Sequence, residues 1–335
     1  MHLREPLIKA FLENIGWASA QRDALVADAS GRTYERLSLK FQNAILMNAP
    51  HEAGENVRPF ISVGNLLADF GLSPPKILNQ DVKNGFLLLE DFGNDIFSDL
   101  CKNSPELEFT MYNTAVSVLV NLHQNSAPDN LLPYTQDVYL REAQLLIKWY
   151  LPAVISKPVP NKISREFDNI AVETFSKIST ENPVLVMRDY HAENLMWLPN
   201  RIGIKRVGLL DFQDALAGHP AYDLVSLLED ARRDTSNELR KEMLKKYLSQ
   251  SNTNPESFRT AYSLLGAQRN IKIIGIFARL ALRDRKVHYV DLIPRVWEHL
   301  MRDLQHPACY KLMEWIATNV PPPTLEVRKK LLDIS

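Results

Sequence analysis

Asp189, Asn194 and Asp211 are oxygen-bearing side chains at the ends of short apolar runs within the stretch Val184–Asp214. A carboxylate on a loop can accept the hydrogen bond of a hydroxyl group and act as its base. Carboxylate and amide oxygens are the hard ligands that Mg²⁺ prefers, with phosphate oxygens and water completing its shell. A base beside a magnesium ion suits phosphoryl transfer, which needs an aligned acceptor and neutralised charge. We therefore interpret Asp189 as a base and the other two as metal ligands.

The runs beside Asn194 and Asp211 are predicted to pair as an antiparallel hairpin, Asn194–Leu198 with Arg206–Leu210. The segment between them, PNRIG, is rich in turn-forming residues. With a turn centred near residue 202, Asn194 faces Asp211, because the two numbers add to about twice 202. The two oxygens are then expected at the open end of the hairpin, beside the loop of the base.

The spacing from Asp189 to Asn194 is D-x-x-x-x-N, as in the catalytic loop of protein kinases, and Asp211 begins Asp-Phe-Gln where kinases have Asp-Phe-Gly. The simpler interpretation of this spacing alone is that the Asp and the Asn lie in ordinary β-turns, where both residue types are common. The second strand-ending Asp at the facing position favours the catalytic interpretation.

His191 and Glu193 suggest a different chemistry, the H-x-E half of a zinc deaminase site. That chemistry needs a downstream P-C-x-x-C, which the sequence lacks. His51-Glu52 likewise has no second His at the spacing of a zinc hydrolase. We interpret His191 as a residue that braces the loop or contacts the acceptor.

The composition is that of an ordinary globular protein, with 45% hydrophobic and 24% charged residues among 335. A net charge of -1 gives no reason to expect nucleic acid or an anionic membrane as a partner. Two cysteines permit one disulfide at most, and free thiols in a reducing cytosol fit better. The N-terminal segment is too charged for a signal peptide, and no apolar run approaches the roughly 18 residues of a membrane span. We expect a cytoplasmic monomer that acts on a small molecule.

Apolar periodicity divides the chain into a small mixed lobe and a large helical lobe, an α+β plan. We predict residues 1–92 as a nucleotide-binding lobe and residues 93–335 as a catalytic and substrate-binding lobe, with Gly93-Asn94-Asp95 as the hinge. The first lobe is predicted as a helix (4–16), two strands (within Ala27–Leu39, and Asn43–Ala49), a helix (Asn56–Phe70) and two strands (Lys76–Asn79 and Phe86–Phe92). The predicted helices of the second lobe are Glu108–His123, Val138–Tyr150, Ser164–Ile178, Ala221–Ala231, Glu238–Leu248, Pro255–Leu282, Val290–Leu304 and Lys311–Ala317.

Three further features have two interpretations each. The turn Ala29–Thr33, with Ser30, Gly31 and Arg32, either covers a phosphate or only joins two strands. Asp223 either hydrogen-bonds the backbone of the catalytic loop or favours the dipole of its own helix. Arg269, inside an apolar helix, either pairs with an acid or faces a ligand.

Several segments resemble the aminoglycoside phosphotransferase/choline kinase family: VMRDYHAENLMWL, LLDFQDALAGHPAYDLVSLL, LLGAQRNIKIIGIFARLALRD, LMNAP, FLLLEDFG and RVWEHLMRDLQHP. Within it they are most similar to the bacterial anomeric kinases of N-acetylmuramate and N-acetylglucosamine. The resemblance covers most of the chain. It implies a protein-kinase-like fold, ATP and Mg²⁺, and phosphorylation of an amino sugar at its anomeric hydroxyl during peptidoglycan recycling.

The resemblance also implies roles for individual residues. Asp189 becomes the catalytic base, and Asn194 and Asp211 the metal ligands. The remaining candidates are Ser30, Gly31, Arg32, Leu89, Glu90, Asp91 and Phe92 for the nucleotide, and Arg188, His191, Gln213, Asp214 and Arg269 for the sugar.

Two departures from the family pattern stand out. The catalytic loop of the wider family begins His-Gly-Asp, and this chain has Met187-Arg188-Asp189. Met47 stands where the phosphate-binding lysine belongs, and the anomeric branch of the family also lacks that lysine. Arg32, Arg36 and Lys40 are the candidates for its replacement.

Two other functions stay open. One is a kinase of the same fold for an aminoglycoside or choline, although the many basic residues of Pro255–Leu304 suit a neutral or acidic sugar better. The other is a catalytically weak, pseudokinase-like binding protein, which the missing lysine suggests and the three oxygen groups oppose.

Overall fold

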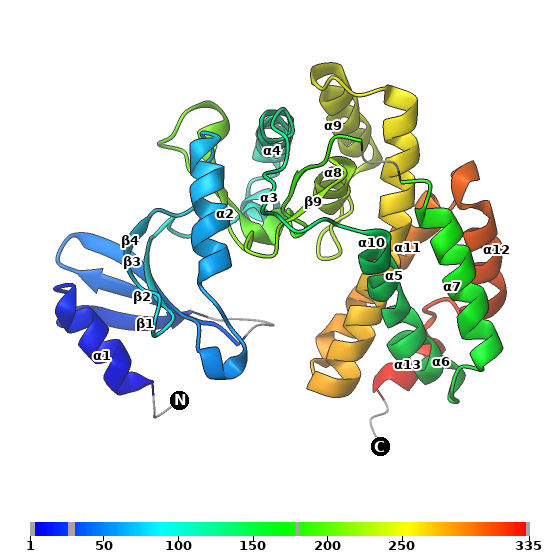
Figure 1. Cartoon of the computed structure of the whole chain (residues 1–335), viewed down its shortest axis with the longest axis horizontal. Coiled ribbons are helices and arrows are strands. Elements are labelled where there is room, and N and C mark those ends of the chain that lie inside the picture. The colour runs from blue at the N-terminus through cyan, green and yellow to red at the C-terminus, as the bar shows by residue number, and fades with distance from the viewer. Residues whose placement is uncertain (1–3, 26–30, 179–180, 333–335) are drawn as a thin grey trace. The chain divides into compact units, whose positions relative to one another are not determined.

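The structure is a computed structural model that describes residues 4–25, 31–178 and 181–332. It divides into two compact units, coloured along the chain in Figure 1. Unit 1 comprises residues 1–118 and 193–214, and unit 2 comprises residues 119–192 and 215–335. The predicted boundary after residue 92 separates a nucleotide-binding lobe from a substrate-binding lobe. The packing of the chain does not show where a nucleotide binds, so this boundary stays a prediction.

The described part of unit 1 is built on an antiparallel sheet with the strand order β1-β2-β3-β5-β4. Three strands precede helix α2, where the sequence predicted two. The additional strand is β1, which pairs along its length with β2. Its sequence QRDAL is largely exposed and has no apolar alternation, so pairing with β2 rather than burial defines it. The elements are α1 (Glu5–Asn14), β1 (Gln21–Leu25), β2 (Thr33–Leu39), β3 (Gln42–Asn48), α2 (Arg58–Asp69), β4 (Ile77–Asp81), β5 (Phe86–Glu90), α3 (Phe97–Asn103) and α4 (Glu108–Leu122), along which the chain passes into unit 2.

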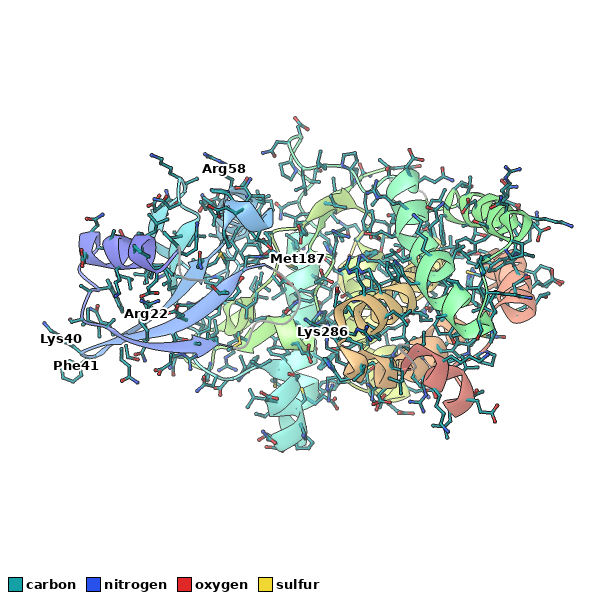
Figure 2. All side chains as sticks on the ribbon, turned by 90° about the horizontal axis from the view of Figure 1, so that it is seen from below. Arg22, Lys40, Phe41, Arg58, Met187 and Lys286 are labelled. Carbon is teal, nitrogen blue, oxygen red and sulfur yellow. The ribbon has the colours of Figure 1, made fainter. Side chains whose placement is uncertain are left out.

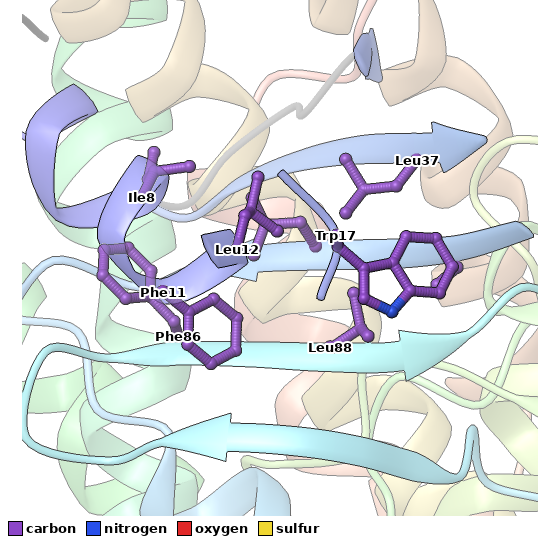
Figure 3. Close-up of a cluster of buried hydrophobic side chains, with 9 residues drawn as sticks. Ile8, Phe11, Leu12, Trp17, Leu37, Phe86 and Leu88 are labelled. Carbon is purple, nitrogen blue, oxygen red and sulfur yellow. The ribbon is translucent and has the colours of Figure 1, made fainter. Parts of the chain in front are cut away.

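Helix α1 packs on one face of this sheet (Figure 3). Alternate residues of a strand point to the same face, so Ala44 and Leu46 of β3 and Phe86 and Leu88 of β5 all contribute to one apolar surface. The apolar residues of α1 that cover this surface recur at the helical spacing that the sequence predicted. The cluster consists of Ile8, Phe11, Leu12, Trp17, Leu37, Ala44, Leu46, Phe86 and Leu88.

The predicted hairpin is present as β7 (Leu195–Trp197) and β8 (Val207–Leu209), and it packs within unit 1. The Leu209 N–H donates to the Ser73 carbonyl, which follows α2, over 2.9 Å. A Cβ on Gly208 would lie 2.9 Å from the ring of Phe92, so glycine is needed for that ring to pack here. The hairpin is thereby attached to the segments that follow α2 and β5.

Unit 2 is mainly helical, and the 30-residue α10 packs against α5, α8 and α11. Its elements are α5 (Gln136–Leu145) continuing into a π-helical turn (Leu146–Tyr150), α6 (Leu151–Ile155), α7 (Asn161–Phe175), β6 (Val184–Val186), β9 (Leu216–Gly218), α8 (Ala221–Leu228), α9 (Asn237–Gln250), α10 (Pro255–Asp284), α11 (Ile293–Asp303), α12 (Tyr310–Asn319) and α13 (Leu325–Leu332). The short strand β9, which the sequence did not predict, pairs with β6 just before the loop that carries Asp189.

The predicted α+β class, with a small mixed sheet followed by a mainly helical part, is confirmed. Helices α3, α6 and α13 were not predicted. The predicted helix 138–150 instead begins at Gln136 and changes to π geometry at Leu146. Among the described residues, no helix combines the length and the apolar character that crossing a membrane requires.

Candidate active site

The β7–β8 hairpin brings Asn194 and Asp211 to its open end, with a register one residue from the expected one. Leu195 faces Leu209, and the Leu210 N–H donates to the Asn194 carbonyl over 2.9 Å. Asn194 therefore stands opposite Leu210, and Asp211 is the next residue. The predicted hairpin is confirmed, and the predicted pairing of 194 with 211 is wrong by one position.

Asp211 has a left-handed backbone conformation, with φ of 56°. Asp tolerates this region better than most residues, since its short polar side chain can hydrogen-bond locally. Its Oδ1 accepts a hydrogen bond from Gln213 Nε2 over 2.8 Å, and its side chain is 47% exposed. Asp211 is thus accessible to a ligand and oriented by Gln213, a residue that the sequence assigned to the sugar.

Arg32 comes close to Asp211 from the turn between β1 and β2. Its Nη1 lies 3.9 Å from Asp211 Oδ1, and its Nε forms an ion pair with Glu55 Oε2 at 3.0 Å. The other Glu55 oxygen accepts the Gly31 N–H over 2.9 Å. Burial works to lower the pKa of the Arg32 guanidinium, but the oxygens of Tyr34, Asp211 and Glu55 raise it more. A permanently charged guanidinium is therefore held beside Asp211.

Gly31 permits a close approach of this turn to the 3₁₀ turn His51–Ala53. A Cβ on Gly31 would lie 3.0 Å from the Ala53 Cβ and 3.3 Å from Glu55 Oε1. A larger residue would therefore displace Glu55 from Arg32. Ser30, the third residue predicted to cover a phosphate, lies outside the described residues.

The other two candidate cations, Arg36 and Lys40, lie elsewhere on the sheet of unit 1. Arg36 forms an ion pair with Asp91 at 2.7 Å and donates to the Gly93 carbonyl over 2.8 Å. Lys40 is at the opposite end of β2, on the β2–β3 turn with Phe41 (Figure 2). Eight residues of extended chain separate it from Arg32, about 26 Å at roughly 3.3 Å per residue.

Met47 is buried on β3, where the family pattern has its lysine, and its neighbours across the sheet are Tyr34 and Leu87. Without an ammonium group at this position, Arg32 is the candidate cation that the structure places nearest to Asp211.

The predicted adenine hinge, Leu89–Phe92, has its acidic side chains engaged within unit 1. Glu90 Oε1 accepts a hydrogen bond from Arg201 Nη2 over 2.6 Å, and Asp91 pairs with Arg36. The Glu90 N–H donates to the Lys76 carbonyl over 2.8 Å, and the contact of this segment with adenine stays a prediction.

In unit 2, two buried carboxylates of the α8 region hold the catalytic loop by its backbone. Asp223 accepts the N–H groups of Met187 and Arg188 over 2.7 and 2.8 Å. Asp230 accepts the Ala192 N–H over 3.2 Å. The predicted bond from Asp223 to the loop is confirmed, while Asp230 was not anticipated. Burial raises the pKa of Asp223 to about 7 even though the two N–H groups oppose this.

Asp189 lies between these two attachment points, near four basic side chains. Burial alone would raise its pKa, but Lys272, His191, Arg269 and Arg188 lower it below its ordinary value. The environment therefore keeps Asp189 ionised, which a base requires. Burial lowers the pKa of His191 and favours its neutral form.

Arg269 is buried near Asp189 on α10. Its Nη2 donates to Ser226 Oγ over 2.8 Å, while its Nη1 has no hydrogen-bond partner among the described residues. A buried guanidinium N–H of this kind is suited to an oxygen of a bound ligand. No carboxylate pairs with Arg269 in the described structure, which favours the ligand-facing interpretation.

Arg188 has a positive φ of 69° and donates through Nη2 to Glu142 of α5. Glu142 also pairs with Lys272 of α10 at 3.1 Å. Neither Glu142 nor Lys272 was predicted as a site residue, because single charges within helices are usually solvent-exposed and carry no signal of their own.

The sequence profile of the phosphotransferase enzyme family matches residues 23–260 of this chain. A protein of Caulobacter vibrioides named N-acetylmuramate/N-acetylglucosamine kinase is 35% identical, over 96% of this chain and 98% of its own length. A protein of the same name from Pseudomonas aeruginosa is 33% identical, over 85% of each chain.

Solved structures show a similar fold. The choline kinase LicA from Streptococcus pneumoniae superposes with a TM-score of 0.63 at 13% identity, over 90% of this chain and 99% of that chain. The gentamicin complex of the aminoglycoside phosphotransferase APH(2")-IIa superposes with a TM-score of 0.61 at 17% identity, over 91% and 97% of the two chains.

Proposed function

The chain belongs to the phosphotransferase enzyme family, and we propose that it transfers the γ-phosphoryl group of ATP to the anomeric hydroxyl of N-acetylmuramate or N-acetylglucosamine. The product would be a sugar 1-phosphate, formed in the recycling of peptidoglycan. The relatives from Caulobacter and Pseudomonas, which carry the name of such kinases, support this substrate class.

The observation that carries the proposal is Asp189, an ionised carboxylate on a loop that Asp223 and Asp230 hold at both ends. An ionised carboxylate accepts the hydrogen bond of the acceptor hydroxyl and takes its proton as the oxygen attacks phosphorus. Fixing the loop by its backbone limits the freedom of the base, which favours an aligned approach.

Asn194 and Asp211 are the residues that would hold Mg²⁺, because they place an amide and a carboxylate at one end of one hairpin. When bound, the ion neutralises charge on the phosphate oxygens. Arg32, fixed by Glu55 beside Asp211, would bind the phosphates of the nucleotide. Gly31, whose N–H donates to Glu55, would keep this carboxylate in place. The backbone of Leu89–Phe92 would contact the adenine.

On the sugar side we assign Arg269 first, because its buried Nη1 has no partner among the described residues. Its neighbours in unit 2 are the other candidates, Arg188 and His191. Gln213 and Asp214 belong to unit 1, where Gln213 orients Asp211, so their contribution to sugar binding would be secondary.

Incubation with ATP, Mg²⁺ and a panel of acceptors tests the proposal, with phosphosugar as the readout. We expect turnover of N-acetylmuramate, N-acetylglucosamine or both. Asp189→Asn should lower kcat by about 10²- to 10⁴-fold, the usual contribution of a general base, without unfolding the protein. Asp129→Asn, at an exposed position of the same unit, is the matched control and should retain activity.

Two results would contradict the proposal in different ways. Turnover of an aminoglycoside or choline without turnover of either sugar would overturn the substrate class and leave the family assignment intact. Full activity of Asp189→Asn would overturn the identity of the base.

A further inference from the structure

Two buried carboxyl groups of unit 2, those of Glu229 and Asp303, share one amide donor. Glu229 directly follows α8 and Asp303 is the last residue of α11, and both helices pack against α10 (Figure 1). Asn270 of α10 donates through the same Nδ2 to Glu229 Oε2 over 2.9 Å and to Asp303 Oδ2 over 3.0 Å. The two carboxyl oxygens therefore lie within roughly 6 Å of each other, and all three side chains are buried.

Gly266 of α10 allows Asp303 to come this close. A Cβ on Gly266 would lie 2.6 Å from Asp303 Cγ, which is closer than non-bonded carbon atoms approach. The carboxyl group thus packs directly on the backbone of α10, one turn before Asn270. A larger residue at position 266 would push Asp303 away from Asn270 and Glu229.

The surroundings of the pair favour one shared proton. Two ionised carboxylates at this separation and away from water would repel each other strongly. Both groups also lie at the C-terminal ends of helices, where the helix dipole disfavours negative charge. Burial and Glu229 raise the pKa of Asp303 well above its usual range, and the two side chains hydrogen-bond each other. Asp303 is therefore the member that carries the proton and donates it to Glu229.

Other titratable groups face the pair from α9, α10, α11 and the turn after α11. They are Arg240, Tyr262, His299, Arg302 and Cys309. Arg302 lowers the pKa of Asp303, and its guanidinium donates to His299 Nδ1 over 3.0 Å. Burial lowers the pKa of His299 and favours its neutral form. Burial and Glu229 outweigh Arg302, so the proton stays on Asp303.

The pair adjoins a residue that holds the catalytic loop. Glu229 immediately precedes Asp230, whose carboxylate accepts the Ala192 N–H over 3.2 Å. On the other side of Asp230, the Ala231 carbonyl accepts Arg295 Nη1 of α11 over 3.2 Å. The segment that contains Asp230 is therefore attached to α10 and α11 on both sides, and the position of its carboxylate depends on these attachments.

Resting on the proposed function, we infer that Asp303 is a positioning residue, whose protonated carboxyl group holds Glu229 and thereby keeps Asp230 bonded to the loop of Asp189. Loss of the proton would place a second negative charge against Glu229, and loss of the side chain would remove its donor. Either change displaces the end of α8 and weakens the bond from Asp230 to Ala192. The base then keeps only the attachment of its loop to Asp223.

Asp303→Asn and Asp303→Ala test the inference as a pair. The amide keeps a neutral donor for Glu229, so Asp303→Asn should retain most of the kcat at neutral pH. Alanine removes the donor, and Asp303→Ala should lower kcat by about 10- to 100-fold, the effect of a misplaced catalytic group. Its affinity for ADP should not change, because the proposed nucleotide contacts belong to unit 1. If Asp303 were instead an anion that serves Arg302, the two variants would be impaired alike.

Hydrogen exchange measures the attachment of the loop without reference to turnover. In Asp303→Ala the protection of the Ala192 amide should fall about tenfold or more, and in Asp303→Asn it should not change. The amides of β2 in unit 1 are the internal reference and should keep their protection in both variants. Gly266→Ala displaces Asp303 without removing its carboxyl group and should give the same loss at Ala192. It replaces Asp303→Ala if thermal unfolding shows that this variant is not folded.

The pH dependence of unfolding tests the proton itself. Because the pKa of Asp303 is raised in the folded protein, its contribution to stability is full below the ordinary value of 3.8 and is lost as the pH rises toward the raised value. Between about pH 5 and pH 8, the unfolding equilibrium constant of the unaltered protein divided by that of Asp303→Asn should rise by up to about tenfold per pH unit. Asp291→Asn is the matched control, because Asp291 is an exposed partner of Arg328 at 3.0 Å in the same unit. It should leave kcat unchanged and give a constant ratio.

Three outcomes would overturn the inference. These are equal kcat in Asp303→Asn and Asp303→Ala, unchanged protection of Ala192 in the folded Asp303→Ala or Gly266→Ala variant, and a ratio of unfolding constants for Asp303→Asn that does not change with pH. Each of them leaves the proposed function intact if the unaltered protein phosphorylates the sugar. A lack of turnover by the unaltered protein would instead overturn the proposed function, and the exchange and unfolding results would still decide whether Asp303 holds the loop.

Discussion

The Nη1 of Arg32 lies 3.9 Å from the Oδ1 of Asp211, although the two residues come from opposite ends of unit 1's sequence. One Glu55 oxygen forms an ion pair with Arg32 Nε, and the other accepts a hydrogen bond from the Gly31 N–H. The ion pair with Glu55 thus holds a guanidinium beside a proposed metal ligand. This is the chemistry that a kinase lysine supplies elsewhere, and Met47 cannot supply it.

Arg32→Met should weaken the binding of ADP and ATP by about 10- to 100-fold, since it removes a charge-assisted contact to phosphate worth about 1.5–3 kcal/mol. Adenosine has no phosphate, so its affinity should not change. Isothermal titration with the three ligands measures this without reference to turnover. Arg32→Lys should recover part of the loss because it retains the charge.

Arg22→Met is the matched control for Arg32→Met. Arg22 lies on β1 of the same sheet and pairs with Glu5 at 2.7 Å and Glu35 at 2.6 Å, so its loss also removes carboxylate ion pairs. It should leave the affinity for all three ligands unchanged. Equal weakening of adenosine and ADP by Arg32→Met would indicate a structural role and contradict the phosphate contact.

The sequence predicted the elements whose residues carry their own periodic pattern. The apolar residues of α1, β5 and α10 form local patterns that indicate a helix or a strand without reference to the rest of the chain. The hairpin was predicted from two apolar runs and a turn. The observed pairing of Leu195 with Leu209 is centred on residue 202, as assumed. The predicted register was wrong by one because that centre places Asn194 opposite Leu210, and Asp211 matches it only approximately.

The sequence did not predict the elements and contacts that depend on a partner far away in the chain. Strand β1 exists because β2 pairs with it, and β9 because β6 does. Glu55 and Glu142 are site residues only through contacts with Arg32 and Arg188, which are remote in the chain. No local propensity or period encodes such a contact. A single sequence could therefore supply the proposed base and metal ligands, but not the ion pairs of the side chains around them.

Asp223 should make the free energy of unfolding depend on pH. Burial raises its pKa in the folded protein to about 7 from 3.8, so its contribution is fully present below about pH 4 and is lost as the pH rises to about 7. We compare the free energy of unfolding of the unaltered protein with that of Asp223→Asn. The difference between the two should fall across this pH range by up to about 1.4 kcal/mol per pH unit and level off above it. Urea unfolding at several pH values measures this difference.

Asp129→Asn serves as the control for this series, because Asp129 is exposed and its substitution should give a pH-independent difference. A difference between the unaltered protein and Asp223→Asn that stays constant from pH 4 to pH 7 would show that Asp223 is ionised throughout. The two backbone N–H groups of the catalytic loop would then outweigh its burial.

Gly275→Ala should lower the free energy of unfolding by about 1–3 kcal/mol, because its Cβ would lie 2.3 Å from the backbone of Leu145 and force α5 and α10 apart. Gly64→Ala in α2 is the control, since its Cβ would meet only the Phe212 ring, at 3.4 Å, and alanine favours helix. Chemical denaturation of both variants measures the difference. Equal stability of the two variants would show that the helices can separate at Gly275 without cost.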